Sequence, residues 1–386
     1  MKQNIRPSRY RSAGLRCAPV LAVLFFAAGC SEEPAVKFGL LVPVDRTAAE
    51  TGAENGAQLA LRAADRAGEG NSPQFQLSIL KTSPSEVKRR MEEAAAHGVI
   101  GFVTADSTIA AGGGIFSIGA TPEMQALALA SFARSELHRS RALVISASTS
   151  SLPAEVRRFR EAFSAAGGIS VDFAASGDLG DMQAVHSLLA RTGADVVFMP
   201  APDMRILGAI RSASGGGPPI PVLGTNRWLE SAVSETASAA AADPLSDTYV
   251  SAAWTQGTAG PRSPFFVAYR AAFGSSPDLA AALSYDAVSA LATAAADAPH
   301  RTGAEVRKAL AGLGVFRGAT GVIQFGDSGV TGRTLLILRR EHGAYVLDER
   351  IEPQGIHDFG EVDAFMNGNS EAGNRTQAGT EAARRL

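Results

Sequence analysis

Cysteine is almost absent from this chain. Its 386 residues include two cysteines, Cys17 and Cys30, and no thiol follows Cys30. A cysteine nucleophile, a cysteine-based metal site and an internal disulfide are therefore excluded for residues 31–386. The fold must depend on its hydrophobic core, and a chain of this length can bury a large one.

Aromatic residues and an excess of one charge are also lacking. Phe, Trp and Tyr make up 6% of the chain, and the formal net charge is −2. So few rings disfavour a pocket lined by aromatic side chains. After the first 30 residues no cluster of Lys and Arg with interleaved aromatics occurs, so nothing indicates nucleic-acid binding. Length and composition are typical of a globular protein of about two domains.

The patterns of the common catalytic sites are missing as well. The six histidines are scattered, without His-x-x-Glu-His or another spacing of metal ligands. The glycine run at 112–114 lacks the Lys-Ser/Thr of a P-loop, and no Gly-x-Ser-x-Gly motif occurs. We therefore predict no enzymatic activity, no metal and no cofactor.

The first 30 residues form a different kind of segment. Five basic residues precede an apolar run at 18–28, which is about 11 residues long and too short for a bilayer span of roughly 20. The run ends in Ala-Ala-Gly-Cys at residues 27–30, which resembles the signal of bacterial lipoproteins. We expect residues 1–29 to be a lipoprotein signal peptide, Cys30 to carry the lipid and residues 30–35 to form a linker. Cleavage without lipidation is the alternative.

From residue 36 onward, apolar strands alternate with amphipathic helices. Strands are expected at 36–43, 75–80, 99–103, 115–118, 142–147, 169–174, 195–200, 220–223 and 249–254, and antiparallel strands at 321–325, 333–340 and 344–347. Helices are expected at 52–67, 84–96, 123–137, 153–166, 181–192, 203–214, 263–273, 278–297 and 305–312. Two such series predict an α/β protein with two doubly wound parallel-sheet lobes. The polar residues 353–386 are expected to form a disordered tail.

Two neighbouring predicted strands end in small polar residues. Ligands of open parallel sheets bind outside the carboxyl ends of the strands, and N–H groups at helix starts can hold a carboxylate there. The ligand contacts predicted in this region are Asp106, Ser107, Thr108, Ala120 and Thr121. The alternative is that Asp106, Ser107 and Thr121 only cap helix N-termini.

A second candidate group follows the predicted strand at 220–223. It consists of Asn226 and Arg227, with Trp228 beside them. Arg227 could face an anion, and Trp228 could stack on a ligand. The alternative is an exposed arginine and a tryptophan packed in the core.

Several short motifs occur in the order seen in one protein family. They are Gly39–Pro43 with Gly56–Ala60, Val99–Gly101 with Asp106–Thr108, Gly119–Pro122, Phe273–Pro277 with Tyr285–Ala287, and Phe316–Gly321 with Phe325 and Gly329. In this order and spacing the sequence resembles the type I periplasmic solute-binding proteins of the branched-chain amino acid (leucine-binding protein-like) group, which serve ABC transporters. The resemblance extends over roughly residues 36–347.

The resemblance implies two lobes that are joined by a hinge of three crossing segments and that close on a ligand. Lobe one is expected at 36–138 plus 254–326, and lobe two at 139–253 plus 327–352. The resemblance further implies a periplasmic protein, held to a bacterial membrane by the lipid on Cys30, that delivers a small polar ligand to an ABC importer permease. The ligand would be an amino acid, an amide or a related carboxylate. We expect a monomer.

Departures from the family pattern leave the ligand open. The usual second-lobe aromatic is replaced within Ser148–Pro153, and an aromatic of the first loop is replaced by Thr51. The acidic residue that often holds a ligand ammonium is replaced within Thr225–Arg227. An ammonium buried there without a partner would be costly. The alternative function is therefore that of a regulatory lipoprotein on the same fold, such as a peptidoglycan synthase activator, without a role in transport.

Overall fold

The computed structural model describes most of the chain after the N-terminal segment. The described residues are 35–43, 47–67, 74–83, 85–104, 109, 114–147, 152–178, 180–230, 243, 245–260, 262–327 and 329–353. They belong to one compact unit. The predicted signal peptide, the lipidation site Cys30 and nearly all of the predicted linker and tail lie outside the described residues.

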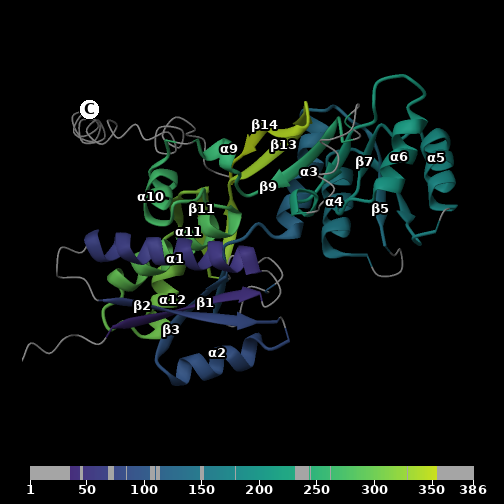
Figure 1. Cartoon of the computed structure of the whole chain (residues 1–386). Coiled ribbons are helices and arrows are strands. Elements are labelled where there is room, and N and C mark those ends of the chain that lie inside the picture. The colour runs from purple at the N-terminus through teal and green to yellow at the C-terminus, as the bar shows by residue number, and fades with distance from the viewer. Residues whose placement is uncertain are drawn as a thin grey trace, which may run out of the picture. The chain divides into compact units, whose positions relative to one another are not determined.

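The described strands form three sheets (Figure 1). The first, in the order β2-β1-β3-β4, contains β1 (Val36–Pro43), β2 (Phe75–Thr82), β3 (Val99–Thr104) and β4 (Ile115–Ser117). The second, in the order β14-β13-β9-β8-β7-β5-β6, contains β5 (Arg141–Ser146), β6 (Ile169–Ala174), β7 (Val196–Phe198), β8 (Val222–Gly224), β9 (Thr248–Ala252), β13 (Leu335–Glu341) and β14 (Ala344–Ile351). The third contains β10 (Val315–Gly318), β11 (Gly321–Gly326) and β12 (Gly329–Arg333).

Parallel pairing dominates the two larger sheets. All pairs among β1 to β4 and among β5 to β9 are parallel, whereas β13 pairs antiparallel with both β9 and β14. Strands such as β1 and β5 are nearly continuous apolar runs with buried side chains on both faces. The structure thus confirms the predicted α/β fold with parallel sheets. The glycine-rich strands β10 and β12 were not expected, because neither has a clear alternation of apolar residues.

Helices cover the sheets. They are α1 (Thr47–Ala67), α2 (Val87–Ala96), α3 (Pro122–Ser135), α4 (Ala154–Ala165), α5 (Gly180–Thr192), α6 (Met204–Ala213), α7 (Arg227–Glu230), α9 (Gln256–Ala259), α10 (Pro264–Phe273), α11 (Leu279–Asp297) and α12 (Gly303–Gly312). Figure 1 shows α2 on the opposite side of the β1–β3 strands from α1. Helices α1 and α11 pack closely because Gly56 has no side chain: a Cβ there would lie 2.0 Å from the carbonyl oxygen of Ala281.

Among the described residues, α11 is the one helix long and apolar enough to cross a membrane. Of its most apolar window, 67% is buried within the protein. Its alanines pack in the main hydrophobic core, so α11 has the character of a core helix.

Helix α3 packs with the seven-stranded sheet. It lies against α4, and the ring of its Phe132 is 5.3 Å from that of Tyr249 on β9. The predicted boundary at residue 138 would instead group α3 with the four-stranded sheet. These contacts place α3 beside the seven-stranded sheet, while the lobes and their boundaries stay a prediction.

A buried polar cluster lies where chain segments pass to the seven-stranded sheet. The carboxylate of Asp286, on α11, is fully buried. It accepts hydrogen bonds from the N–H groups of Ala319 (2.6 Å) and Thr320 (2.8 Å) and from the Thr320 hydroxyl (2.5 Å). The turn between β10 and β11 is thereby fixed to α11.

Arg333, at the end of β12, completes this cluster. Its guanidinium is buried and donates to the Thr320 hydroxyl (2.8 Å) and to the carbonyl oxygen of Ile118. Ile118 lies between β4 and α3, and Arg333 lies just before β13, so one side chain joins two segments that lead to the seven-stranded sheet. Burial raises the pKa of Asp286 to about 6, against the opposing effect of its hydrogen bonds and of Arg333.

Candidate functional site

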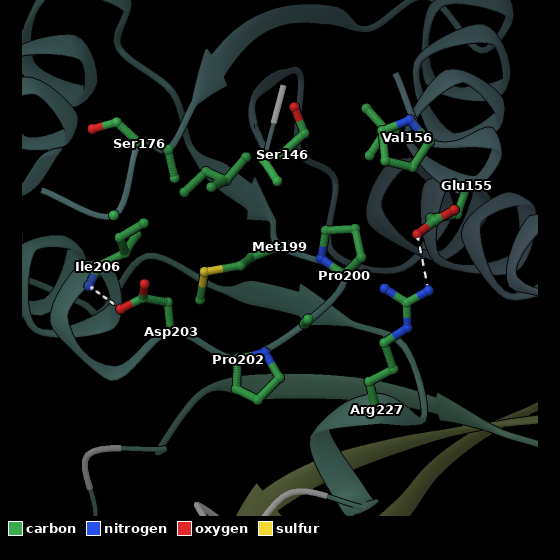
Figure 2. A pocket seen from close by; sticks show the side chains of 16 residues that line it. Ser146, Glu155, Val156, Ser176, Met199, Pro200, Pro202, Asp203, Ile206 and Arg227 are labelled. Carbon is green, nitrogen blue, oxygen red and sulfur yellow. Dashed lines mark hydrogen bonds and ion pairs between the residues drawn. The ribbon is translucent and has the colours of Figure 1, made fainter. Parts of the chain in front are cut away.

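A cavity of ≈ 390 Å³ lies at the carboxyl edge of the seven-stranded sheet (Figure 2). Residues after β5, β6 and β7, residues at the starts of α4 and α6, and one residue of α7 surround it. They are Ile145, Ser146, Ala147, Pro153, Glu155, Val156, Ala175, Ser176, Gly177, Met199, Pro200, Ala201, Pro202, Asp203, Ile206 and Arg227. None of these described lining residues is aromatic, in agreement with the composition.

The order of the strands explains the position of the cavity. In the sheet, β6 lies on one side of β5 and β7 on the other. The connection that follows β5 therefore runs to one side of this strand, and the chain then crosses to β7 on its other side. The loops after β5 and β7 consequently diverge at this edge of the sheet. Open parallel sheets bind ligands at such a point, outside the carboxyl ends of the strands.

Two polar side chains of the lining form hydrogen bonds with the starts of neighbouring helices. The Asp203 carboxylate caps α6 by accepting from the N–H groups of Arg205 (2.9 Å) and Ile206 (3.3 Å). The Ser176 hydroxyl donates to Asp181 (2.9 Å) at the start of α5. Burial alone would raise the pKa of Asp203, but the hydrogen bonds from Arg205 and the helix start outweigh it and hold the pKa below its usual value. Asp203 therefore stays ionised as a cap.

Arg227 supplies the cation of the cavity. Its Nη2 lies 3.3 Å from Oε1 of Glu155, whose side chain is 8% exposed, whereas the Arg227 side chain is 50% exposed. Figure 2 shows the guanidinium reaching from α7 toward Glu155, with its other terminal nitrogen directed toward the middle of the cavity. A guanidinium has five N–H donors, so it can hold Glu155 and still offer donors to an anionic group of a ligand.

The second predicted group is only partly at this cavity. Arg227 lines it, whereas Asn226 faces α3. Trp228 is 1% exposed, and its Nε1 donates to the carbonyl oxygen of Met199 (2.9 Å). Trp228 therefore packs in the core, as the alternative for this residue had it, and Arg227 is half exposed and ion-paired.

The first predicted group lies mostly outside the described residues, which do not include Asp106, Ser107 and Thr108. Ala120 is buried. The Thr121 hydroxyl accepts from the N–H of Met124 (3.2 Å), which is the geometry of a helix N-cap. Ligand contact by Ala120 and Thr121 stays a prediction.

One residue that the sequence did not single out connects the two groups. Gln125, on α3, is 1% exposed. Its Nε2 donates to the carbonyl oxygen of Ala120 and to Oδ1 of Asn226, both at 3.1 Å. Its Oε1 accepts from the N–H of Asn226 (2.8 Å) and from the Ser251 hydroxyl (3.4 Å). A glutamine on the apolar face of a predicted helix was the signal that could have revealed it.

Comparison with known families identifies the fold. The sequence model described as periplasmic binding protein matches residues 79–341. The chain belongs to the periplasmic binding protein family. Membership in this family implies an extracytoplasmic location. Among curated proteins, no sequence matches this periplasmic binding protein.

Solved structures of similar fold come from several bacteria. A leucine binding protein of Thermotoga maritima is 18% identical with a TM-score of 0.60, and the match covers 83% of this chain and 100% of that one. An ABC transporter substrate-binding protein of Desulfitobacterium hafniense, in complex with Leu, is 17% identical with a TM-score of 0.63 (81% and 99% covered). A solute binding protein of Rhodopseudomonas palustris, in complex with benzoate, is 15% identical with a TM-score of 0.58 (83% and 99% covered). At these identities the likeness concerns the fold alone.

Proposed function

We propose that this periplasmic binding protein captures a small polar ligand, an amino acid, amide or related carboxylate, and delivers it to the permease of an ABC importer. The observation that carries the proposal is the cavity at the carboxyl edge of β5, β6 and β7, with a half-exposed arginine in its lining. A binding site at a sheet switch point needs no catalyst. Two lobes would close on the ligand by a hinge motion.

The proposal includes membrane attachment through Cys30. Removal of residues 1–29 would leave Cys30 as the new N-terminus, joined to the folded unit by a few residues. A diacyl-type anchor holds a protein to a membrane surface without a spanning helix. Mass spectrometry of the protein from membranes tests this point: an N-terminal lipid on Cys30 is expected, and an unmodified N-terminus would overturn it.

A thermal denaturation screen tests ligand binding. The chain from Ser31 to Leu386 is first unfolded and refolded to remove bound ligand, then heated with single amino acids, amides, short peptides and small carboxylates. A ligand at 100 times its dissociation constant adds about 2.7 kcal/mol to the free energy of unfolding. A raised Tm with one chemical class would support the proposal and identify the class.

The absence of aromatic side chains from the described cavity lining keeps a second candidate open. A regulatory lipoprotein on the same fold, such as a peptidoglycan synthase activator, would act through a protein partner. A screen without any shift in Tm, followed by capture of a cell-wall synthase on the immobilised chain, would favour this function over transport.

A further inference from the structure

The four hydrogen bonds of Gln125 use its whole capacity. A glutamine amide has two N–H donors and a carbonyl oxygen with two acceptor positions. Here the donors go to Ala120 and Asn226, and the acceptors take the N–H of Asn226 and the hydroxyl of Ser251. Because Gln125 is buried, its amide would lack water as a substitute partner.

These partners are remote in the sequence and close to the predicted ligand groups. Asn226 is 101 residues from Gln125, and Ser251 is 126 residues from it. Ala120 belongs to the segment between β4 and α3, and Asn226 immediately precedes α7. One side chain therefore fixes the first predicted ligand segment against the second.

The segment at Asn226 continues directly to the cavity. Its neighbours form hydrogen bonds with residues that follow β7. The Thr225 hydroxyl donates to the carbonyl oxygen of Pro200 (2.8 Å), and Trp228 Nε1 donates to the carbonyl oxygen of Met199 (2.9 Å). Both acceptor residues line the cavity, as does Arg227. The place of the Arg227 guanidinium thus depends on a short turn held between the cavity and Gln125.

We propose that Gln125 is a positioning residue that, through Asn226, sets the place of the Arg227 guanidinium at the cavity and its distance from Ala120 and Thr121. This inference rests on the proposed function, because it concerns a residue that shapes the proposed ligand site. Asn226 bonds to both the amide nitrogen and the amide oxygen of Gln125, and Ala120 accepts from the nitrogen, so the orientation of the amide, as well as its size, is required.

The two tryptophans of the chain provide a test without ligand. Trp228 follows Arg227 in α7, and Trp254 lies after β9 in a different hydrophobic cluster. The full chain is labelled with 5-fluorotryptophan, and Trp254→Phe assigns the two ¹⁹F resonances. The variants are Gln125→Glu and Gln125→Leu, and Gln58→Glu on α1 is the matched control, because Gln58 bonds only to Glu54 among the described contacts.

At pH 7.5, Gln125→Glu places a carboxylate against the carbonyl oxygens of Ala120 and Asn226. The Trp228 resonance is expected to move by more than its linewidth while the Trp254 resonance stays in place. Burial raises the pKa of a carboxyl group, so at pH 5 the introduced carboxyl regains a donor and the Trp228 resonance is expected to return toward its wild-type position. Gln125→Leu should displace it at both pH values.

Unchanged Trp228 resonances in both variants, or equal displacement of both tryptophans, would overturn the inference, because the second result indicates general loosening. If Gln125→Leu does not fold, Asn226→Ala replaces it and should displace the Trp228 resonance in the same direction at both pH values. Titrations with L-leucine and benzoate test the proposed function separately: failure of the wild type to bind either probe weakens that function and leaves the NMR result to decide on Gln125.

Discussion

Arg333 and Arg227 are two arginines whose roles differ because one is buried and the other is half exposed. Arg333 is 3% exposed and reaches the buried Asp286 through the hydroxyl of Thr320. The Arg227 side chain is 50% exposed and meets Glu155 directly at 3.3 Å. The first arrangement satisfies a buried charge with several fixed partners, and the second leaves donors of the guanidinium in contact with solvent.

The difference indicates which of the two can change partner. Removing one member of a buried charged cluster leaves the other in a medium of low polarity, which is costly. When one member of a pair is half exposed, as Arg227 is, solvent screens the pair and its net contribution to stability is small, so that member can exchange its partner for water, salt or a ligand. We therefore infer that Arg333 holds the chain segments together, and we propose Arg227 as the residue that meets the ligand. Four predictions test this comparison.

The largest effect is expected for Arg333→Met, which keeps most of the side-chain volume and removes the charge. It leaves Asp286 without a nearby cation and the carbonyl oxygen of Ile118 without its donor. We expect a loss of about 3–5 kcal/mol in the free energy of unfolding at pH 7.5, measured by urea denaturation. Arg158→Met, on the exposed face of α4, is the control. Equal stability of the two variants would contradict the role given to Arg333.

Thr320→Val tests the hydroxyl between the two charges. Valine has nearly the same shape, but it neither donates to Asp286 nor accepts from Arg333. The expected loss is about 1–3 kcal/mol, since two buried partners each lose one hydrogen bond. Thr293→Val removes an exposed hydroxyl on α11 that donates to Ser289, and it should change stability by less than about 0.5 kcal/mol. A loss of stability no larger than that of the control would show that the Thr320 hydroxyl is not needed between Asp286 and Arg333.

The pH dependence of stability tests the burial of Asp286. Burial raises its pKa from 3.8 to about 6. Between these values the native state binds more protons than the unfolded state, so the contribution of Asp286 is complete below 3.8 and is lost as the pH rises through about 6. Relative to the wild type, Asp286→Asn should therefore gain roughly 1–2 kcal/mol between pH 4.5 and 7.5. Parallel pH profiles of the two proteins would argue against a raised pKa.

The fold was largely predictable because long apolar strands and amphipathic helices alternate. β1 and β5 show the apolar strand pattern clearly, and the alternation of strands and helices itself predicted parallel sheets. β10 and β12 escaped prediction because their pairing with β11, rather than their own sequence, makes them strands. The sheet on which α3 packs was not predictable for a similar reason: the apolar residues of this helix show that it packs on a sheet and do not show which one.

The presence of Arg227 in the candidate site was predictable, whereas the residues that hold it in place were not. Arg227 was found because it follows a strand, where parallel sheets bind ligands. Glu155 and Gln125 act through contacts with residues far away in the sequence. The sequence pattern shows that Gln125 lies on the inner face of a helix, but the identity of its partners depends on how β8 and β9 lie beside that helix.

The smallest effect is expected at the cavity, where Arg227 and Glu155 are compared by a double-mutant cycle. Arg227→Gln, Glu155→Gln and the double variant should give a coupling energy of about 0–1 kcal/mol, because Arg227 is half exposed and solvent screens the pair. Glu155 lies in the first turn of α4, where the helix N-terminus also stabilises a carboxylate. Salt should reduce the coupling further. A coupling as large as the loss expected for Arg333→Met would mean that Arg227 is bound as firmly to Glu155 as Arg333 is to its cluster, and it would remove the reason for assigning Arg227 to the ligand.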